Sequence, residues 1–349
     1  MASWAATVKE GLAQVQSRGG QLIGPGDARR RIALGEAVEI VRDGLLWEAS
    51  GRIVIPPARR AVLRVPLPDG EAGVTSISKC CVISELDVVG YRFLGSILGD
   101  DPVRYLHIAS LSRRTLLATI DEHLTYLLRI AALAVVAAAH TVAAPRPTVG
   151  VVGAGRLARA VVEALIEAGR AGEVVVTSRH PASREQLVRA LATAGFARAH
   201  AVDSVREVAG RADFLVTATN AMAPVLSPEW IKPGATVYGL GAGEELPPAL
   251  FMRAERGSVR LVVSNWAECA ERSDFRGLIA DGRVSKADVD AELWEIVGGR
   301  VPARLRADDT VCLRAPGSVG LDVLLGAWIC ARHASETRAA VDRGGVGNA

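Results

Sequence analysis

The fold class of this 349-residue chain is indicated most clearly by the stretch Thr148-Val-Gly-Val-Val-Gly153-Ala-Gly155-Arg-Leu-Ala158. It consists of a short apolar strand, a G-x-G-x-x-A turn and the beginning of a helix. In that context the first glycine permits a tight turn, the second lets a pyrophosphate approach the backbone, and the helix N-terminus faces the phosphate charge. The motif therefore predicts a dinucleotide site. Its predicted contacts are Gly153, Ala154, Gly155, Arg156 and Leu157.

Apolar strands alternate with helices along the region that follows Thr148. Each predicted strand is a short run of mostly apolar residues, which is typical of strands that are buried on both faces. Such strands, separated by helices, indicate a parallel sheet wound in two directions. The sequence thus predicts an α/β fold with a Rossmann doubly wound parallel sheet. The predicted strands are TVGVV, EVVVT, RAHAV, DFLVTAT, ATVYGL and VRLVVS.

The region before the motif has a different pattern. Residues 53–121 contain strand-like segments separated by turn formers. An apolar helix follows over 123–144, and Pro145 and Pro147 end it. A last helix is predicted from about Gly320 onward.

These patterns predict two domains, since the chain is long for a single core. Residues 1–127 form a smaller mixed α+β domain, onto which the C-terminal helix, 320–349, packs back. Residues 128–319 form the Rossmann dinucleotide-binding domain.

Composition and charge exclude several classes of protein. Lys and Arg number 41 against 38 Asp and Glu, a net charge of +3 without a long block of one sign, so no nucleic-acid partner is expected. The longest apolar run, Ile130 to Ala139, is too short to span a membrane, and no signal pattern occurs at the N-terminus. The five cysteines show no C-x-x-C spacing, so neither a metal site nor a disulfide framework is expected. We expect a cytoplasmic protein.

The end of the second predicted strand bears on the choice of cofactor. An NAD site usually has Asp or Glu there to bind the ribose 2′-hydroxyl, but the sequence of this chain is Thr177-Ser178-Arg179-His180. Ser178 and Arg179 suit a ribose 2′-phosphate, so the sequence favours NADP, with NAD as the alternative cofactor. Arg179 could instead be an ordinary solvated surface arginine without a role in binding. Later strand ends that border the cofactor in such folds add three candidate contacts: Thr217, Thr219 and Leu240.

Further short signatures occur in a fixed order around the dinucleotide motif. They are Pro57-Ala58-Arg59, Lys79 on a following predicted strand, Arg129 followed by Ala131-Ala132, and the loop Gly317-Ser318-Val319-Gly320. With the G-x-G-x-x-A turn, these signatures resemble the ornithine cyclodeaminase/mu-crystallin family from about Leu34 to Arg332.

The resemblance is closest to one branch, the dehydrogenases of 2,3-diaminopropionate biosynthesis in siderophore pathways. The stretch that carries it includes Trp266-Ala-Glu-Cys269, Ser285-Lys286 and Ala291-Glu292-Leu293. Together with the arginine-rich composition, it suggests a role in secondary metabolism.

The family resemblance implies roles for particular residues. The first domain would hold the substrate and form a homodimer through its sheet. Arg59 and Lys79 would hold the carboxylate of a small amino or imino acid, and Arg129 would lie between substrate and cofactor. Ser318 would contact the cofactor and Val319 the substrate.

The sequence also departs from the family pattern. The cyclodeaminases carry an Asp in a loop after the fifth strand, where this chain has Gly243, with Glu244 one residue later. The family Thr after the helix arginine is Ile130, and Asp322 stands earlier than the family Asp that follows the S-x-G loop. The segment 82–101 matches poorly, and we expect it to shape substrate specificity.

The sequence is therefore compatible with three functions. The favoured one is an NAD(P)-dependent oxidoreductase of the C–N bond of an amino or imino acid: an imine or ketimine reductase, or an opine-type amino acid dehydrogenase. Lys79 is its candidate proton donor, and Asp121 is the second candidate, although Asp121 also suits a helix cap. The alternatives are a cyclodeaminase-like lyase that recycles NAD, which Gly243 disfavours, and a non-catalytic protein that binds NADPH and a small acid.

Overall fold

The computed structural model describes residues 2–15, 20–67, 70–97, 103–241, 243–271 and 273–344; for 59–75, 96–97, 273 and 340–344 it describes only the backbone. It divides the chain into two compact units. Unit 1 comprises Met1–Arg129 and Ser318–Ala349, and unit 2 comprises Ile130–Gly317. The sequence placed these boundaries at 127/128 and 319/320.

Unit 1 contains a six-stranded sheet in the order β1-β6-β5-β4-β3-β2. Strands β2 to β6 form an antiparallel meander, and β1 joins its edge parallel to β6. The mixed sheet agrees with the mixed α+β domain expected from the sequence. Its strands are β1 (Gln21–Ile23), β2 (Arg59–Leu67), β3 (Gly70–Ile83), β4 (Val88–Ile97), β5 (Val103–Ser110) and β6 (Thr115–Asp121).

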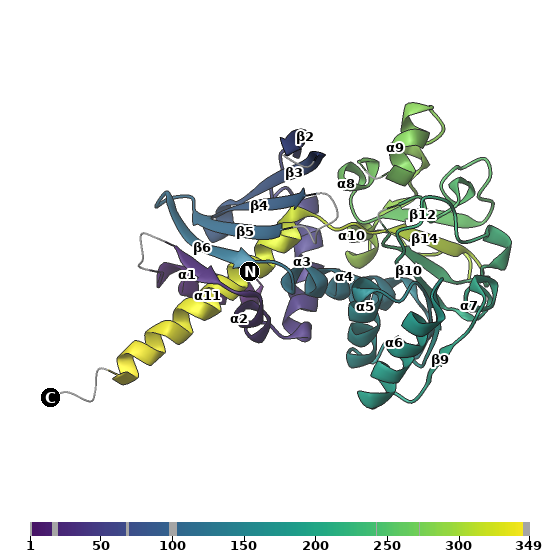
Figure 1. The fold of residues 1–349 in the computed structure, drawn as a ribbon, viewed down its shortest axis with the longest axis horizontal. Helices are drawn as coiled ribbons and strands as arrows, with labels where there is room; N and C mark the ends of the chain where they lie inside the picture. The colour runs from purple at the N-terminus through teal and green to yellow at the C-terminus, as the bar shows by residue number, and fades with distance from the viewer. Residues whose placement is uncertain are drawn as a thin grey trace. The chain divides into compact units, whose positions relative to one another are not determined.

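One face of this sheet is covered by the long C-terminal helix α11, drawn in yellow in Figure 1. Two glycines allow the close approach. A Cβ on Gly90 of β4 would lie 2.2 Å from a methyl group of Val323, and one on Gly326 of α11 would lie 2.4 Å from Leu106. The helices of unit 1 are α1 (Ser3–Ala13), α2 (Pro25–Arg30), α3 (Leu34–Ala49), the single turn η1 (Ser84–Leu86) and α11 (Val319–Gly344), and α4 (Thr125–Thr141) begins in it.

The strand register assigns each side chain of this sheet to one of two faces. Lys79, Arg92 and Leu106 are cross-strand partners on the face toward α11, here called the inner face, where Leu106 is buried. The next row points to the opposite, outer face, and there Tyr91 is 51% exposed. The outer face also carries the exposed apolar side chains of Phe93, Val103 and Tyr105.

Unit 2 contains an eight-stranded sheet in the order β13-β12-β14-β11-β10-β7-β8-β9, and every pair in it is parallel. The chain leaves β7 toward β8 and β9 and then returns to the other side of β7 at β10. This confirms the predicted doubly wound Rossmann fold. The strands are β7 (Thr148–Val152), β8 (Glu173–Thr177), β9 (Ala199–Ala201), β10 (Phe214–Thr217), β11 (Thr236–Gly239), β12 (Val259–Val263), β13 (Ala291–Glu292) and β14 (Thr310–Arg314).

The helices of unit 2 pack their apolar sides against this sheet. In α5 the side toward the sheet carries Val161, Val162 and Leu165, all of them buried. The rings of Phe251 and Phe275 lie 4.7 Å apart in the hydrophobic core of unit 2. The helices are α5 (Arg156–Glu167), α6 (Pro181–Thr193), α7 (Val205–Arg211), α8 (Trp266–Ala270), α9 (Ser273–Ala280) and α10 (Leu293–Val297), with the single turns η2 (Pro228–Trp230), η3 (Pro248–Leu250) and η4 (Lys286–Asp288).

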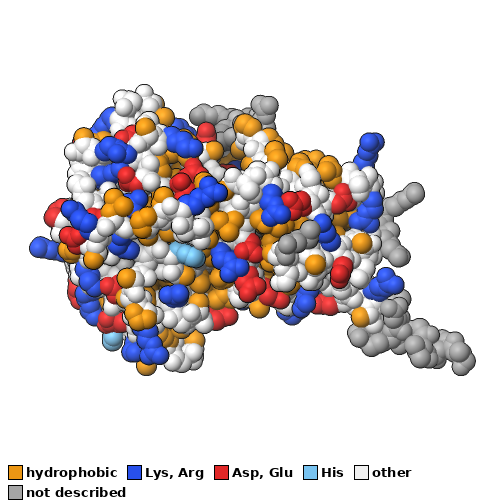
Figure 2. All heavy atoms as spheres, turned by 180° about the vertical axis from the view of Figure 1, so that it is seen from behind, with side chains coloured by type: hydrophobic (Ala, Val, Ile, Leu, Met, Phe, Trp, Pro, Cys, Tyr) orange, Lys and Arg blue, Asp and Glu red, His pale blue; other side chains and the backbone are white. Residues whose placement is uncertain are grey.

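The surface shows no gathering of charge by sign on the face drawn in Figure 2, where basic and acidic side chains are interspersed. This distribution fits the small net charge of +3. Within the described part of the chain, every helix is too short or too polar to span a bilayer.

Candidate active site

The predicted dinucleotide turn of unit 2 leaves its backbone open at the start of α5. Gly153 has φ +108°, and a Cβ on it would lie 2.4 Å from the carbonyl oxygen of Ala218, so only glycine fits. Gly155 is the N-cap residue of α5, and no atom lies within 4 Å of the place its Cβ would occupy. The turn therefore combines helix N–H groups with room for a phosphate, as a dinucleotide requires.

The end of β8 carries basic and hydroxyl groups. Ser178 Oγ donates to the carbonyl oxygen of His180 at 2.8 Å, and Arg179 is exposed beside the His180 ring. Arg184 donates to the carbonyl oxygen of Ser178 at 3.1 Å and also pairs with Asp203. This arrangement leaves the Arg179 guanidinium available to an anion at the place where a ribose 2′-phosphate would bind.

The sequence did not reveal the role of Glu245, which lies after β11 and is fully buried. Its carboxylate accepts hydrogen bonds from Thr217 Oγ1 at 2.7 Å, from Thr219 Oγ1 at 2.7 Å and from the Thr219 backbone N–H at 2.8 Å. It also accepts one from Gly241 N–H at 2.7 Å. Both predicted threonines therefore use their hydroxyls to hold the ends of β10 and β11 together, next to the buried Leu240.

Gly243, which stands where cyclodeaminases have Asp, has no space for a side chain. A Cβ there would lie 2.0 Å from the carbonyl oxygen of Ala221 and 3.4 Å from the sulfur of Met222. The neighbouring Glu244 is exposed, and its N–H donates to the same Ala221 carbonyl at 3.0 Å. An Asp at position 243 would require this loop to move.

In unit 1 the predicted Arg129 belongs to a buried ionic cluster. Its Nε lies 2.8 Å from Oδ1 of Asp322, in the first turn of α11, while Oδ2 of Asp322 lies 3.5 Å from Nε of Arg92. Nε of Arg92 also donates to Glu122, at 2.7 and 3.0 Å from its two oxygens. Asp322 therefore bridges two arginines. Neither Arg92 nor Glu122 was marked by a sequence signature.

Burial and charge act in opposite directions on this cluster. Burial disfavours the charge of Asp322, but Arg129 and Arg92 outweigh it and hold the Asp322 pKa below its ordinary value. Burial likewise disfavours the charge of Arg92, but Asp322 and Glu122 outweigh it and raise the Arg92 pKa. For Glu122 burial prevails over the attraction of Arg92 and raises the pKa. The two carboxyl groups thus differ in their affinity for a proton.

The other predicted site residues of unit 1, Lys79, Asp121 and Arg59, do not share one place on the sheet. Lys79 lies on the inner face, paired with Arg92 across β3 and β4. Asp121 lies on the outer face and accepts from the N–H of His123 at 3.0 Å, so it acts as a local cap and is not beside Lys79. Arg59 begins β2, and its side chain lies outside the described part of the chain.

The loop before α11 is held within unit 1. The buried Ser318 hydroxyl donates to the carboxylate of Glu48 in α3, and Val319 is also buried. A Cβ on Gly320 would lie 2.6 Å from the same Glu48 carboxylate, so this approach requires glycine. The S-V-G signature thus fixes the start of the helix that carries Asp322.

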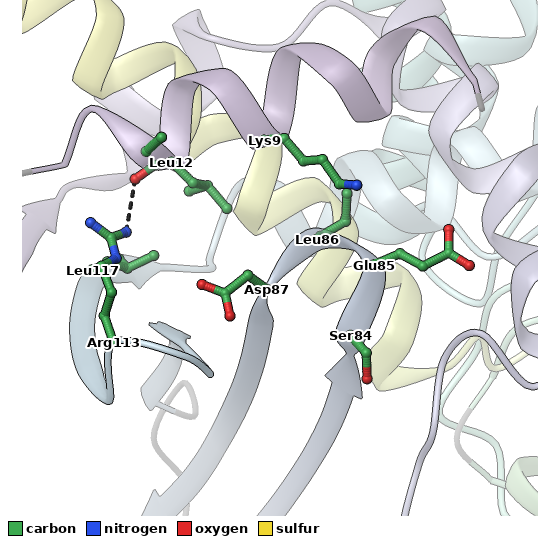
Figure 3. Close-up of a pocket in the computed structure, with 9 residues that line it drawn as sticks. Lys9, Leu12, Ser84, Glu85, Leu86, Asp87, Arg113 and Leu117 are labelled. Atoms are coloured by element: carbon green, nitrogen blue, oxygen red, sulfur yellow. Dashed lines mark hydrogen bonds between the residues drawn. The ribbon is translucent and has the colours of Figure 1, made fainter.

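Two hollows occur in unit 1. One, of about 770 Å³, lies on the outer face of the sheet, where the side chains of Ser78, Cys80, Tyr91, Phe93 and His107 point, and its lining also includes Pro56, Pro57, Ala58, Lys79 and Arg92. A smaller one, of about 430 Å³, lies between α1 and the turn η1 (Figure 3), and Arg113, which also lines it, donates to the carbonyl oxygen of Leu12 at 2.9 Å. Among the residues whose side chains the structure describes, none of the predicted site residues lines the smaller hollow.

The residues that resemble the diaminopropionate branch form hydrogen bonds between separate elements of unit 2. Glu292 accepts from the N–H of Trp266 at 3.2 Å and from the indole N–H of Trp294 at 2.8 Å. The thiol of Cys269 donates to the carbonyl oxygen of Arg314 at 3.4 Å. These contacts join α8 and α10 to the carboxyl ends of the sheet strands.

Comparisons with known proteins agree with the fold and with the expected class of activity. The Δ1-pyrroline-2-carboxylate reductase of Bacillus cereus is 21% identical over 330 residues, 93% of this chain and 97% of that one. The N-((2S)-2-amino-2-carboxyethyl)-L-glutamate dehydrogenase of Staphylococcus aureus is 23% identical over 137 residues, 39% of each chain. Both names describe oxidoreductases, and the second relative represents the branch expected from the sequence.

Solved structures show the same fold. The Δ1-pyrroline-2-carboxylate reductase of Thermococcus litoralis, in complex with NADH and L-proline, superposes with a TM-score of 0.79 at 18% identity, covering 91% of this chain and 98% of that one. The family model described as the ornithine cyclodeaminase/mu-crystallin family matches residues 105–327, more than half of the chain. The chain therefore belongs to the ornithine cyclodeaminase/mu-crystallin family.

Proposed function

We propose that this protein is an NAD(P)-dependent oxidoreductase that acts on the C–N bond of a small α-amino or α-imino acid. The observation that carries the proposal is the dinucleotide turn of unit 2, in which Gly155 leaves open space at the N-terminus of α5. The named activities of the relatives support the reaction class. When bound, the reduced nicotinamide supplies a hydride to the imine carbon.

The residues of unit 2 would bind and orient the cofactor. The turn from Gly153 to Leu157 receives the pyrophosphate at the helix N-terminus. Arg179, exposed at the end of β8, would pair with a 2′-phosphate, which favours NADPH over NADH. Glu245 holds the ends of β10 and β11, which border the cofactor in this fold.

The residues of unit 1 would bind the substrate. Arg59, Lys79 and Arg129 keep the role that the family resemblance implies, with Ser318 on the cofactor and Val319 on the substrate. In the reductive direction the Lys79 ammonium gives its proton to the imine nitrogen, so the product is an amine. Lys79 is preferred over Asp121 because Asp121 lies on the outer face of the sheet, next to His123.

The partner expected from the sequence is a second copy of the chain. The outer face of the unit 1 sheet supports this, since it exposes Tyr91, Phe93, Val103 and Tyr105. Apolar side chains grouped on one sheet face indicate a contact surface. We propose a homodimer formed through this face.

A purified-protein assay tests the proposed function. Oxidation of NADPH or NADH is followed by its nicotinamide absorbance in the presence of Δ1-pyrroline-2-carboxylate and open-chain ketimines of α-keto acids. We expect net oxidation that depends on the imino acid and is faster with NADPH. Release of ammonia from ornithine without net cofactor turnover would instead indicate the lyase, and cofactor binding without any turnover the non-catalytic protein.

A further inference from the structure

Arg314, the last residue of β14, carries its charge in the interior of unit 2. The strand lies between β11 and β12, and only 1% of the Arg314 side chain is exposed. Its Nε lies 2.6 Å from Oδ2 of Asp274, in the first turn of α9, and the Asp274 side chain is equally buried. A buried charge without a partner is costly, so Asp274 allows the guanidinium to stay at this strand end.

The Arg314 guanidinium lies against the backbone that follows β11. Its Nη2 donates to the carbonyl oxygen of Gly241 at 3.0 Å. A Cβ on Gly239 would lie 2.9 Å from Cδ of Arg314 and 3.1 Å from its Nη1, so the arginine approaches the strand end because Gly239 has no side chain. A hydrogen bond from a charged donor is stronger than one between neutral groups, so this contact holds the Gly241 carbonyl in place.

The backbone of Leu240 and Gly241 is held from two sides. The N–H of Leu240 donates to the carbonyl oxygen of Thr217 at 2.9 Å, and the N–H of Gly241 donates to Glu245 at 2.7 Å. The Gly241 carbonyl accepts from Arg314, and Glu245 also accepts from the Thr217 hydroxyl. The polar contacts that begin at the Arg314 ion pair thus continue through Gly241 and Glu245 to the end of β10.

This backbone belongs to the side of the sheet that would bind the nicotinamide half of the cofactor. The turn for the pyrophosphate follows β7, and Arg179, placed for the 2′-phosphate of the adenosine, follows β8. A doubly wound sheet binds the two nucleotides over its two halves, on either side of the point where the strand order reverses. That point lies between β7 and β10, so the nicotinamide half is expected over the ends of β10 and β11.

We propose that Arg314 and Asp274 are positioning residues for the nicotinamide half of the cofactor. Arg314 fixes the Gly241 carbonyl, and with it the backbone that borders the nicotinamide, while Asp274 holds Arg314 in place from α9. This inference rests on the proposed function, because it requires that the protein binds a nicotinamide dinucleotide. It gives α9, a short helix outside the sheet, a role in setting the place of the ring that donates the hydride.

The test compares two ligands, one with and one without the nicotinamide half. NADPH and adenosine 2′,5′-bisphosphate are titrated into the full-length protein by calorimetry. We expect Arg314→Met to weaken NADPH binding about 10-fold, because the Gly241 backbone must then be ordered on binding. Binding of adenosine 2′,5′-bisphosphate should be unchanged. NADH and ADP make the same comparison for the alternative cofactor.

A double variant separates positioning from stability. Arg314→Met alone leaves the Asp274 carboxylate buried without its partner, so it should also destabilise unit 2. Asp274→Leu/Arg314→Met leaves no charge behind, and apolar replacement of a buried pair should restore much of the stability. NADPH binding should nevertheless stay about 10-fold weaker than in wild type, because Gly241 still lacks its donor. If the affinity recovers together with the stability, the pair is merely structural and the inference is overturned.

Two further variants serve as controls. Arg256→Met removes another buried arginine of unit 2, whose Nη2 lies 2.9 Å from Asp290. Arg256 precedes the amino end of β12, at the opposite edge of the sheet from the strand ends that border the cofactor, so its loss should leave the affinity for both ligands unchanged. Arg314→Lys keeps the charge but not the fork that reaches Asp274 and Gly241 together, so its NADPH affinity should fall between wild type and Arg314→Met.

The outcomes distinguish this inference from the proposed function. An equal loss of both ligands in the double variant, or no loss of either, would overturn the inference. If NADPH binding alone depends on Arg314 but no imino acid is reduced, only the proposed function fails. If imino acids are reduced and the double variant keeps both its NADPH affinity and its kcat, only the inference fails. A wild type that binds neither NADPH nor NADH would overturn both.

Discussion

Oδ1 of Asp322 lies 2.8 Å from Nε of Arg129, although the two residues are 193 positions apart in the sequence. The pair joins the first turn of α11 to the beginning of α4, and both side chains are almost completely buried. A buried ion pair adds little by itself, but removal of one partner leaves a charge without compensation. The pair therefore makes the fold of unit 1 depend on its C-terminal segment.

The first prediction concerns the stability of unit 1. Asp322→Asn should lower the free energy of unfolding by about 3–5 kcal/mol, because Arg129 and Arg92 then remain buried beside a neutral group. Urea denaturation followed by circular dichroism measures the change. The matched control is Glu163→Gln, which breaks the exposed Arg159–Glu163 pair and should change stability by less than about 0.5 kcal/mol. Equal effects of the two variants would contradict the role given to Asp322.

The second prediction concerns the pH dependence of this contribution. Burial disfavours the charged Asp322, but its two arginines hold its folded pKa below the ordinary value of 3.8. The unfolded state therefore binds the proton more readily, so the stabilisation is present above pH 4 and is lost as the pH falls through the folded pKa. The difference in unfolding free energy between wild type and Asp322→Asn should shrink below about pH 4. A difference that stays constant down to pH 2 would be inconsistent with this ion pair.

The third prediction concerns the loop at Gly243. Gly243→Ala and Gly243→Asp should both destabilise the protein, because a Cβ would lie 2.0 Å from the carbonyl oxygen of Ala221. Gly277→Ala in α9, where no atom lies within 4 Å of the new Cβ, should stabilise by about 0.5 to 1 kcal/mol. Thermal unfolding measures both. Gly243→Asp should release no ammonia from ornithine, and a stable variant with lyase activity would refute the reading of this loop.

The fourth prediction concerns the carboxylate that holds the strand ends. Glu245→Ala should destabilise unit 2 by about 1–3 kcal/mol, since it leaves the Thr217 hydroxyl and the Gly241 N–H buried without their acceptor. It should also weaken NADPH binding, because these strand ends border the cofactor. Calorimetric titration and thermal unfolding check the two effects. The exposed neighbour, Glu244→Ala, serves as control, and an unchanged affinity in Glu245→Ala would show that the strand ends tolerate its loss.

Much of the nucleotide-binding unit was predictable from local patterns. The strand, the G-x-G-x-x-A turn and the helix after it are encoded within a dozen residues, and apolar runs mark the other parallel strands. The order of the strands was not encoded in this way. Strand β14 inserts between β11 and β12, and its last residue, Arg314, is fully buried against Asp274 at 2.6 Å. A charged residue at the end of a strand gives no local sign that a distant carboxylate will cover it.

The candidate site was predictable only where single residues matched family signatures. Family signatures marked Lys79 and Arg129 as candidates, but no signature marked the residues that surround them in unit 1. Arg92 lies in a segment that does not match the family pattern. Glu245 follows a glycine-rich loop directly after Glu244, and nothing in the sequence distinguishes the buried glutamate from the exposed one. Their roles depend on strand register and on contacts between segments far apart in the sequence, which periodicity does not report.

The most direct measurement of the central claim is the fate of a labelled hydrogen. The protein is incubated with Δ1-pyrroline-2-carboxylate and NADPH deuterated at the transferable position of its nicotinamide, and the products are analysed by mass spectrometry and NMR. An imino acid oxidoreductase places the deuterium on the α-carbon of proline, with one oxidised cofactor formed for each product. Proline without deuterium, or oxidised cofactor formed without any amino acid product, would contradict the claim.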